Sequence, residues 1–271
     1  MKKLVPIIVL VLILATGATA YGFKKISGRT SKAKTAPTPT PTPPIEETIN
    51  ERPFVSLLPT ADGHWVTLEV KNLPKGTQGM EYDLIYLADV EGSKIERGVT
   101  TGGKPIELNG AVEYSKKILL GSASCTTGVC KYKYDENVSE GTLMIKVIGR
   151  ETAEYKTAYR LQRGAEAKTD GFSTGDGNFR LTATLPAKTL YLTTSTIGVP
   201  TPLPTGVTPK SVPYGVFPAL SGKVEVAFKT DLTEPTVYAY SGRNWQKLTT
   251  TVQNGEAVAS TSGASIFILT K

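Results

Sequence analysis

Residues 64–71 read His-Trp-Val-Thr-Leu-Glu-Val-Lys, with valine or leucine at every second position from Val66. Successive side chains of a β-strand point to opposite faces, so this alternation predicts a strand with one face buried. Residues 143–148 and 155–161 alternate in the same way. In residues 82–87 both sets of positions are largely apolar, which indicates a strand covered on both faces.

Turn-forming residues separate these runs, notably the clusters at 61–63, 73–76, 102–105 and 108–110. Short strands at such spacing favour an antiparallel β-sandwich, so residues 53–165 are predicted to form a first Ig-like module. No window after the N-terminus has the periodicity of an amphipathic helix. The sequence therefore predicts an all-β protein.

A second sandwich module is predicted for residues 166–271. The Gly-, Thr- and Asp-rich stretch 164–178 marks the boundary. Strand-like runs resume after it, at 179–183, 190–193, 224–228, 236–240 and 265–269. Six prolines between residues 199 and 218 predict a long loop there, because proline cannot donate to the ladder of a central strand.

The N-terminus is predicted to insert in a membrane. Residues 4–23 carry no charge and are mostly apolar, and about 20 such residues span a hydrocarbon core as a helix. We expect an uncleaved single-pass anchor within residues 1–25, with the C-terminal part extracellular because a signal-like segment leads export. Cleavage after Ala20, at an A-x-A site, is the alternative and would release a secreted protein. The Pro/Thr-rich residues 26–52 are predicted to form a semi-rigid linker.

The charge excess argues against nucleic acid as a partner. The chain has 271 residues and a net charge of +7. Residues 1–52 hold eight basic and three acidic side chains, whereas residues 53–165 hold fourteen of each. The excess thus lies beside the apolar segment, where it suits anionic lipid, and the folded part lacks the clustered basic stripe of a nucleic-acid binder.

Cys125 and Cys130 are the only cysteines. In an oxidising exterior, two cysteines at this spacing are expected to form a disulfide that closes a short loop. Redox use is the alternative, although it normally takes a C-x-x-C spacing at a helix start. The third possibility is that both cysteines are free thiols.

The remaining motifs point away from catalysis. One histidine and two cysteines exclude a multi-histidine zinc site and a four-cysteine site. The GxSxG string at 171–175 lies among turn residues and has no later histidine, so Ser173 is expected in a turn. Asp176 and its neighbours likewise favour a turn over a calcium loop. We predict no catalytic residue, no cofactor and no metal site.

Residues 53–163 resemble the small β-sandwich domain of uncharacterised, membrane-anchored surface proteins of small-genome uncultivated bacteria. The run Gly-Ser-Ala-Ser-Cys-Thr-Thr-Gly-Val-Cys-Lys-Tyr at 121–132, followed by Glu-Gly-Thr-Leu at 140–143, carries the resemblance. Members combine a Lys-Lys-led membrane segment and a Pro/Thr linker with this domain. The resemblance implies no catalytic residues.

The predicted function is extracellular, non-enzymatic presentation of the modules to an envelope polysaccharide or a surface protein. Loops 121–131 and 199–218 are the expected contact regions, since loops on rigid sandwiches often carry function. The aromatic candidates for a binding surface are Trp65, Tyr214, Phe217 and Trp245. A self-associating envelope component is one alternative. The other is a wall enzyme that uses Cys125, Cys130 or Ser173 with His64, or a pair of carboxylates.

Overall fold

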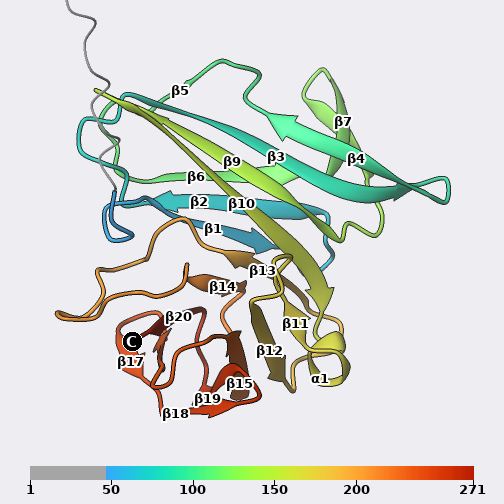
Figure 1. The fold of residues 1–271 in the computed structure, drawn as a ribbon. Helices are drawn as coiled ribbons and strands as arrows, with labels where there is room; N and C mark the ends of the chain where they lie inside the picture. The colour runs from blue at the N-terminus through green and yellow to red at the C-terminus, as the bar shows by residue number, and fades with distance from the viewer. Residues whose placement is uncertain (1–46) are drawn as a thin grey trace, which may run out of the picture. The chain divides into compact units, whose positions relative to one another are not determined.

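Strands dominate the computed structural model, which describes residues 47–271. This part of the chain holds twenty strands and one short helix, and every strand pairing is antiparallel (Figure 1). The all-β prediction is confirmed. The elements are β1 (Phe54–Pro59), β2 (Trp65–Lys71), β3 (Gly79–Val90), β4 (Ser93–Thr100), β5 (Ile106–Glu107), β6 (Tyr114–Leu119), β7 (Gly121–Thr126), β8 (Val129–Tyr134), β9 (Glu140–Ile148), β10 (Thr152–Arg163), α1 (Glu166–Thr169), β11 (Phe172–Ser173), β12 (Phe179–Ala183), β13 (Leu190–Ser195), β14 (Tyr214–Phe217), β15 (Lys223–Lys229), β16 (Thr236–Tyr240), β17 (Trp245–Lys247), β18 (Thr250–Gln253), β19 (Glu256–Ser262) and β20 (Ile266–Thr270).

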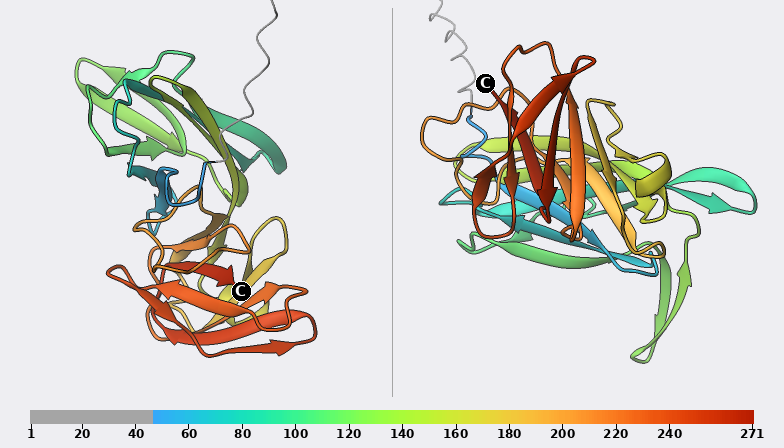
Figure 2. Two further views of the ribbon diagram at one scale, coloured as in Figure 1. Left: turned by 60° about the vertical axis from the view of Figure 1, so that its left-hand side comes forward. Right: turned by 90° about the horizontal axis from the view of Figure 1, so that it is seen from below.

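One long sheet runs through both halves of the described chain. Its strand order is β17-β16-β20-β14-β13-β10-β9-β3-β4, with β5 added beside β3. The twelve-residue β10 makes the connection: Thr152–Arg160 pairs with β9, and Tyr159–Arg163 pairs with β13. The views of Figure 2 show this strand passing from one half to the other. The sheet therefore crosses residue 165, where the sequence predicts a module boundary.

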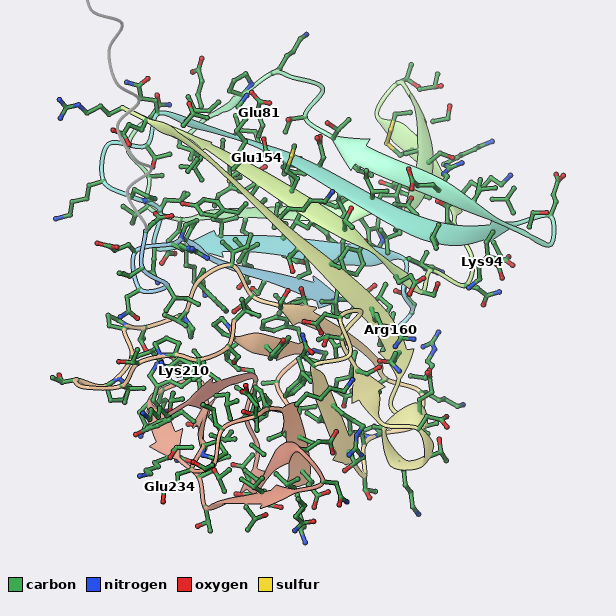
Figure 3. All side chains as sticks on the ribbon, in the orientation of Figure 1. Glu81, Lys94, Glu154, Arg160, Lys210 and Glu234 are labelled. Carbon is green, nitrogen blue, oxygen red and sulfur yellow. A yellow bond between two sulfur atoms is a disulfide. The ribbon has the colours of Figure 1, made fainter. Side chains whose placement is uncertain are left out.

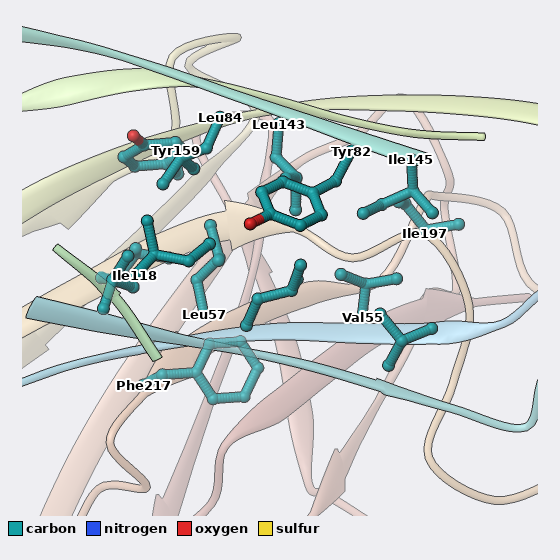
Figure 4. Close-up of a cluster of buried hydrophobic side chains, with 14 of the residues drawn as sticks. Val55, Leu57, Tyr82, Leu84, Ile118, Leu143, Ile145, Tyr159, Ile197 and Phe217 are labelled. Atoms are coloured by element: carbon teal, nitrogen blue, oxygen red, sulfur yellow. The ribbon is translucent and has the colours of Figure 1, made fainter. Parts of the chain in front are cut away.

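The first hydrophobic core lies between the three-stranded sheet β1-β2-β6 and the part of the long sheet that holds β3, β9 and β10. Alternate residues of β2 are buried, as the pattern of residues 64–71 predicts. Figure 4 shows side chains of the two layers facing each other across this core, among them Leu57, Ile118, Leu84 and Ile145.

The second core lies between the five-stranded sheet β11-β12-β15-β19-β18 and the strands β13, β14, β16 and β20. Ring contacts fill it. The Phe179 ring centroid lies 5.0 Å from that of Tyr214, 5.1 Å from that of Phe228 and 5.7 Å from that of Phe267.

Strand β20 is covered on both faces, which explains its unbroken apolar sequence. Ile266 belongs to the first core, and Phe267 and Leu269 belong to the second. Strand β14 is shared in the same way, because Phe217 packs in the first core and Val216 in the second. The two cores thus share strands of one sheet, and we expect them to unfold together.

The Pro-rich segment 199–218 corrects one expectation. The sequence predicts no central strand there, yet β14 lies inside the long sheet between β13 and β20. The strand fits because its four residues stand between Pro213 and Pro218, so no ladder N–H is lost. Pro213 takes part as an acceptor, since its carbonyl accepts a hydrogen bond from the Thr196 N–H at 2.8 Å.

The predicted anchor at 4–23 and nearly all of the linker lie outside the described residues. Within residues 47–271, the structure has no helix of the length and apolarity that crossing a membrane requires.

Candidate functional site

The hairpin β7–β8 projects from the rest of the described chain (Figures 1 and 2). Its register runs from Gly121 opposite Tyr134 to Thr126 opposite Val129. Thr127 and Gly128 form the two-residue turn with φ values of 49° and 83°, the positive values that a type I′ turn requires. Glycine adopts this conformation without a steric cost, which explains Gly128.

The structure contains the predicted disulfide between Cys125 and Cys130, which stand opposite each other in this hairpin. It is the yellow bond within the projecting hairpin of Figure 3. A two-stranded hairpin is marginally stable by itself in water, so a covalent link here favours its ordered form. The bond also removes both thiols from the enzyme alternative, because a disulfide sulfur is not a thiolate nucleophile.

We predict that replacing both cysteines by serine destabilises the hairpin by about 2 kcal/mol, the chain-entropy value for so short a loop. Hydrogen exchange of the amides in residues 121–134 measures this local loss. Exchange elsewhere in both cores should stay unchanged, because neither core contains a side chain from residues 121–134. Unchanged exchange in the hairpin would contradict the prediction.

One face of the hairpin carries two tyrosines. The period of the strand places Cys130, Tyr132 and Tyr134 on the same side. The residues opposite the tyrosines are small: Ala123 faces Tyr132, and Gly121 faces Tyr134. A Cβ atom at Gly121 would lie 2.2 Å from the Lys133 carbonyl oxygen, so that position admits no side chain. The side chains of β7 therefore leave the rings uncovered, and Tyr132 is 46% exposed.

These tyrosines join Trp65, the first residue of β2, and His64 just before it to form a surface group of four rings, which we call the aromatic cluster: His64, Trp65, Tyr132 and Tyr134. Tyr134 stacks on His64, with centroids 3.7 Å apart and planes at 4°. The Tyr132 and Tyr134 rings are almost parallel, at 12°, with centroids 6.1 Å apart. Trp65 meets Tyr132 edge to face at 5.5 Å. Lys117 of β6 places its ammonium 4.8 Å from the centre of the Trp65 ring, a cation–π contact.

The base of the hairpin is fixed by the backbone and by a buried carboxylate. Leu120 donates its N–H to the His64 carbonyl at 2.9 Å, and Asp135 donates its N–H to the Leu120 carbonyl at 3.0 Å. The Asp135 side chain is only 7% exposed and lies 3.2 Å from the guanidinium of Arg97. It also accepts a hydrogen bond from the Tyr86 hydroxyl at 2.7 Å. Burial and this hydrogen bond raise the pKa of Tyr86 to about 12, so the hydroxyl stays a donor at neutral pH.

A cleft of about 680 Å³ adjoins the aromatic cluster. Two cluster residues, His64 and Tyr134, form part of its lining. The rest comes from the turn before β2, the segment after β8, the end of β10, α1 and the start of β13. The polar lining includes Asp62, Glu136, Asn137, Ser139, Arg163 and Glu166, and the apolar lining includes Val138, Leu161 and Leu190.

Hydrogen bonds hold the walls of this cleft in place. Asp62 lies 3.1 Å from the His64 imidazole and accepts the His64 backbone N–H at 3.0 Å. The Thr60 hydroxyl, and then the His64 N–H, hold the pKa of Asp62 below its usual value, so this carboxylate stays ionised at neutral pH. Arg163 donates to the carbonyls of Ala61 at 3.2 Å and Lys188 at 2.9 Å. The buried Ser139 hydroxyl has no hydrogen-bond partner among the described residues.

The other three aromatic candidates are buried or half-buried. Tyr214 is 2% exposed and Phe217 is 6% exposed, so both are core residues and not the surface residues expected from the loop around them. Trp245 is half-buried against Tyr240, and its indole N–H donates to the Thr201 carbonyl at 3.2 Å. Of the four candidates, Trp65 alone joins the aromatic cluster.

Ser173 and Asp176 also have structural partners. The Ser173 hydroxyl accepts a hydrogen bond from the Arg160 guanidinium at 2.7 Å. The Asp176 carboxylate accepts bonds from Thr174, from Asn178 and from the Tyr214 hydroxyl, the last at 2.9 Å, so it closes the turn expected there. Within residues 47–271, no three histidine, cysteine or acidic side chains gather as a metal site.

Sequence reasoning missed Tyr132 and Tyr134. A signal was present, because the alternating Lys-Tyr-Lys-Tyr run at 131–134 follows Cys130 and predicts tyrosines on one face of a strand. The partnership with His64 and Trp65 joins segments about 70 residues apart and has no local signal. The sequence matches no family model and no curated protein.

Proposed function

We propose that this protein is a membrane-anchored, extracellular and non-enzymatic binding protein that holds an envelope polymer at the aromatic cluster. Residues 4–23 anchor it, the Pro/Thr linker sets its height, and two Ig-like sandwiches joined by the shared long sheet form the folded part. The observation that carries the proposal is the aromatic cluster itself: four rings on and beside a projecting, disulfide-closed hairpin.

Several properties of the cluster suit binding. Tyrosine and tryptophan supply a large contact area, and they are enriched at binding surfaces and among the residues that dominate binding energy. The rings already contact one another and the hairpin is covalently closed, so a ligand has little to order when it binds.

The extracellular location has separate support. A disulfide in a small loop persists in an oxidising compartment and is rare in the cytosol. The apolar segment 4–23 is long enough to span a bilayer as a helix, and its signal-like position at the N-terminus suits export of the residues that follow it.

The proposal is tested with the full chain in mild detergent and the cell envelope of the source cells, treated with protease to leave its polymers. We expect the polymer to retain the chain, and Tyr132→Ala to weaken retention about ten-fold, which corresponds to about 1.4 kcal/mol. The matched control is Tyr238→Ala, which removes a half-buried ring from β16 in the other half of the long sheet. Retention of that variant should equal that of the unmodified chain.

Three results would contradict the proposal. Without retention of the unmodified chain, the polymer is not the ligand. Equal losses in both variants would mean that the cluster is not the site. Concentration-dependent self-association without retention would favour the structural envelope component instead.

A further inference from the structure

We infer that the ligand of this site is a neutral, hydroxyl-rich glycan whose chain passes from the exposed Tyr132 ring into the adjoining cleft. The inference rests on the proposed function and names the chemical class of its ligand. Its basis is the way in which the aromatic cluster and the cleft join.

The cluster and the cleft form a continuous surface, because His64 and Tyr134 belong to both. Tyr132 extends that surface outward, nearly parallel to Tyr134 and almost half exposed. A ligand that packs on the tyrosine rings therefore lies at the mouth of a cleft with a polar lining. A saccharide fits both parts, since the C–H faces of its rings pack against aromatic rings and its hydroxyl groups hydrogen-bond along its edges.

The charges of the cleft favour a neutral ligand over an anionic one. Asp62, Glu136 and Glu166 contribute carboxylates to the lining. A fourth carboxylate, that of Asp135, is paired with Arg97. The one lining arginine, Arg163, donates to two backbone carbonyls, and the imidazole of His64 pairs with Asp62. An anionic polymer would meet excess negative charge here, whereas sugar hydroxyls can donate to the exposed carboxylates of Asp62 and Glu136.

The nearby lysines do not reverse this balance. The alternation of β8 places Lys131 and Lys133 on the hairpin face opposite the tyrosines. Lys117 lies over the Trp65 ring, outside the cleft lining.

An oligosaccharide array tests the inference with the full chain in detergent. The probes are neutral hexose and N-acetylhexosamine oligomers on one side, and uronic-acid and sulfated oligomers on the other. We expect binding to neutral oligomers, and less than about a two-fold change in affinity between about 0.05 and 0.5 M salt, because screening acts on charged ligands.

Two charge reversals locate the site. Glu136 is exposed and lines the cleft, so Glu136→Lys removes an acceptor and should weaken binding to neutral oligomers at least about five-fold. The matched control, Glu151→Lys, makes the same change at an exposed position in the β9–β10 turn and should leave the affinity unchanged. Equal thermal midpoints of both variants confirm that the fold is intact.

Each other outcome has a distinct meaning. Binding to uronic-acid or sulfated oligomers with steep salt dependence would overturn the inference and leave the proposed function standing. Retention by the envelope polymer without binding to any arrayed neutral oligomer would also overturn it. If the envelope polymer does not retain the chain, the proposed function itself is wrong. The separate retention experiment tests this.

Discussion

Phe179→Ala is expected to lower the free energy of unfolding by about 3–5 kcal/mol, the range for truncating a buried aromatic ring. Phe179 is 1% exposed and lies at the centre of the second core, in contact with the rings of Tyr214, Phe228 and Phe267. Those partners come from β14, β15 and β20, two of which are interior strands of the long sheet. They cannot close around the cavity without moving that sheet, which keeps the cost high.

The measurement is chemical denaturation followed by tryptophan fluorescence and by far-UV circular dichroism. Because the two cores share strands of one sheet, we expect both signals to shift to the same lower midpoint. Phe179→Leu keeps most of the apolar volume and should cost clearly less. A loss below about 1 kcal/mol for the alanine variant, or separate transitions for the two signals, would contradict this description of the core.

Gly141→Ala is the second substitution with a large expected effect, about 3 kcal/mol or more. Gly141 stands in β9 between Tyr86 of β3 and Tyr159 of β10. A Cβ atom there would lie 1.9 Å from the Ile85 carbonyl oxygen and 2.6 Å from the Tyr159 hydroxyl. These two groups form a hydrogen bond of 3.0 Å, so the methyl group must displace it or push the strands apart.

A matched control for this substitution is Gly175→Ala. Gly175 is exposed, and a Cβ atom there would meet no other atom within 4 Å. We expect its thermal midpoint to remain within the small range of ordinary surface substitutions. Equal melting temperatures of the two alanine variants would show that the space around Gly141 is not restricted.

Much of the strand content could be predicted from local pattern. The alternation of residues 64–71, 143–148 and 155–161 corresponds to β2, β9 and β10. The pairing of β10 with β13 could not be predicted, because it depends on contacts between distant segments. The prolines of segment 199–218 predict no central strand, yet β14 forms there. Only a proline within the ladder removes a hydrogen bond, and β14 contains none.

The candidate site was predictable only in part. The cysteine spacing predicts the disulfide of the hairpin, and Trp65 was a candidate from its residue type. Tyr214 and Phe217 were candidates because they stand in a Pro-rich segment, and the structure buries both in the cores. Conversely, Tyr132 owes its exposure to the small residue opposite it and to the projection of the hairpin, neither of which is a property of its own sequence position.

Hydroxyl-radical footprinting of the full chain, with and without the protein-free envelope polymer, shows whether the polymer binds at the aromatic cluster. Oxidation of exposed aromatic side chains reports which rings the ligand covers. We predict that bound polymer lowers the oxidation of Tyr132 and Trp65 and leaves that of Tyr238 unchanged. Bound polymer with undiminished oxidation of Tyr132 would contradict it.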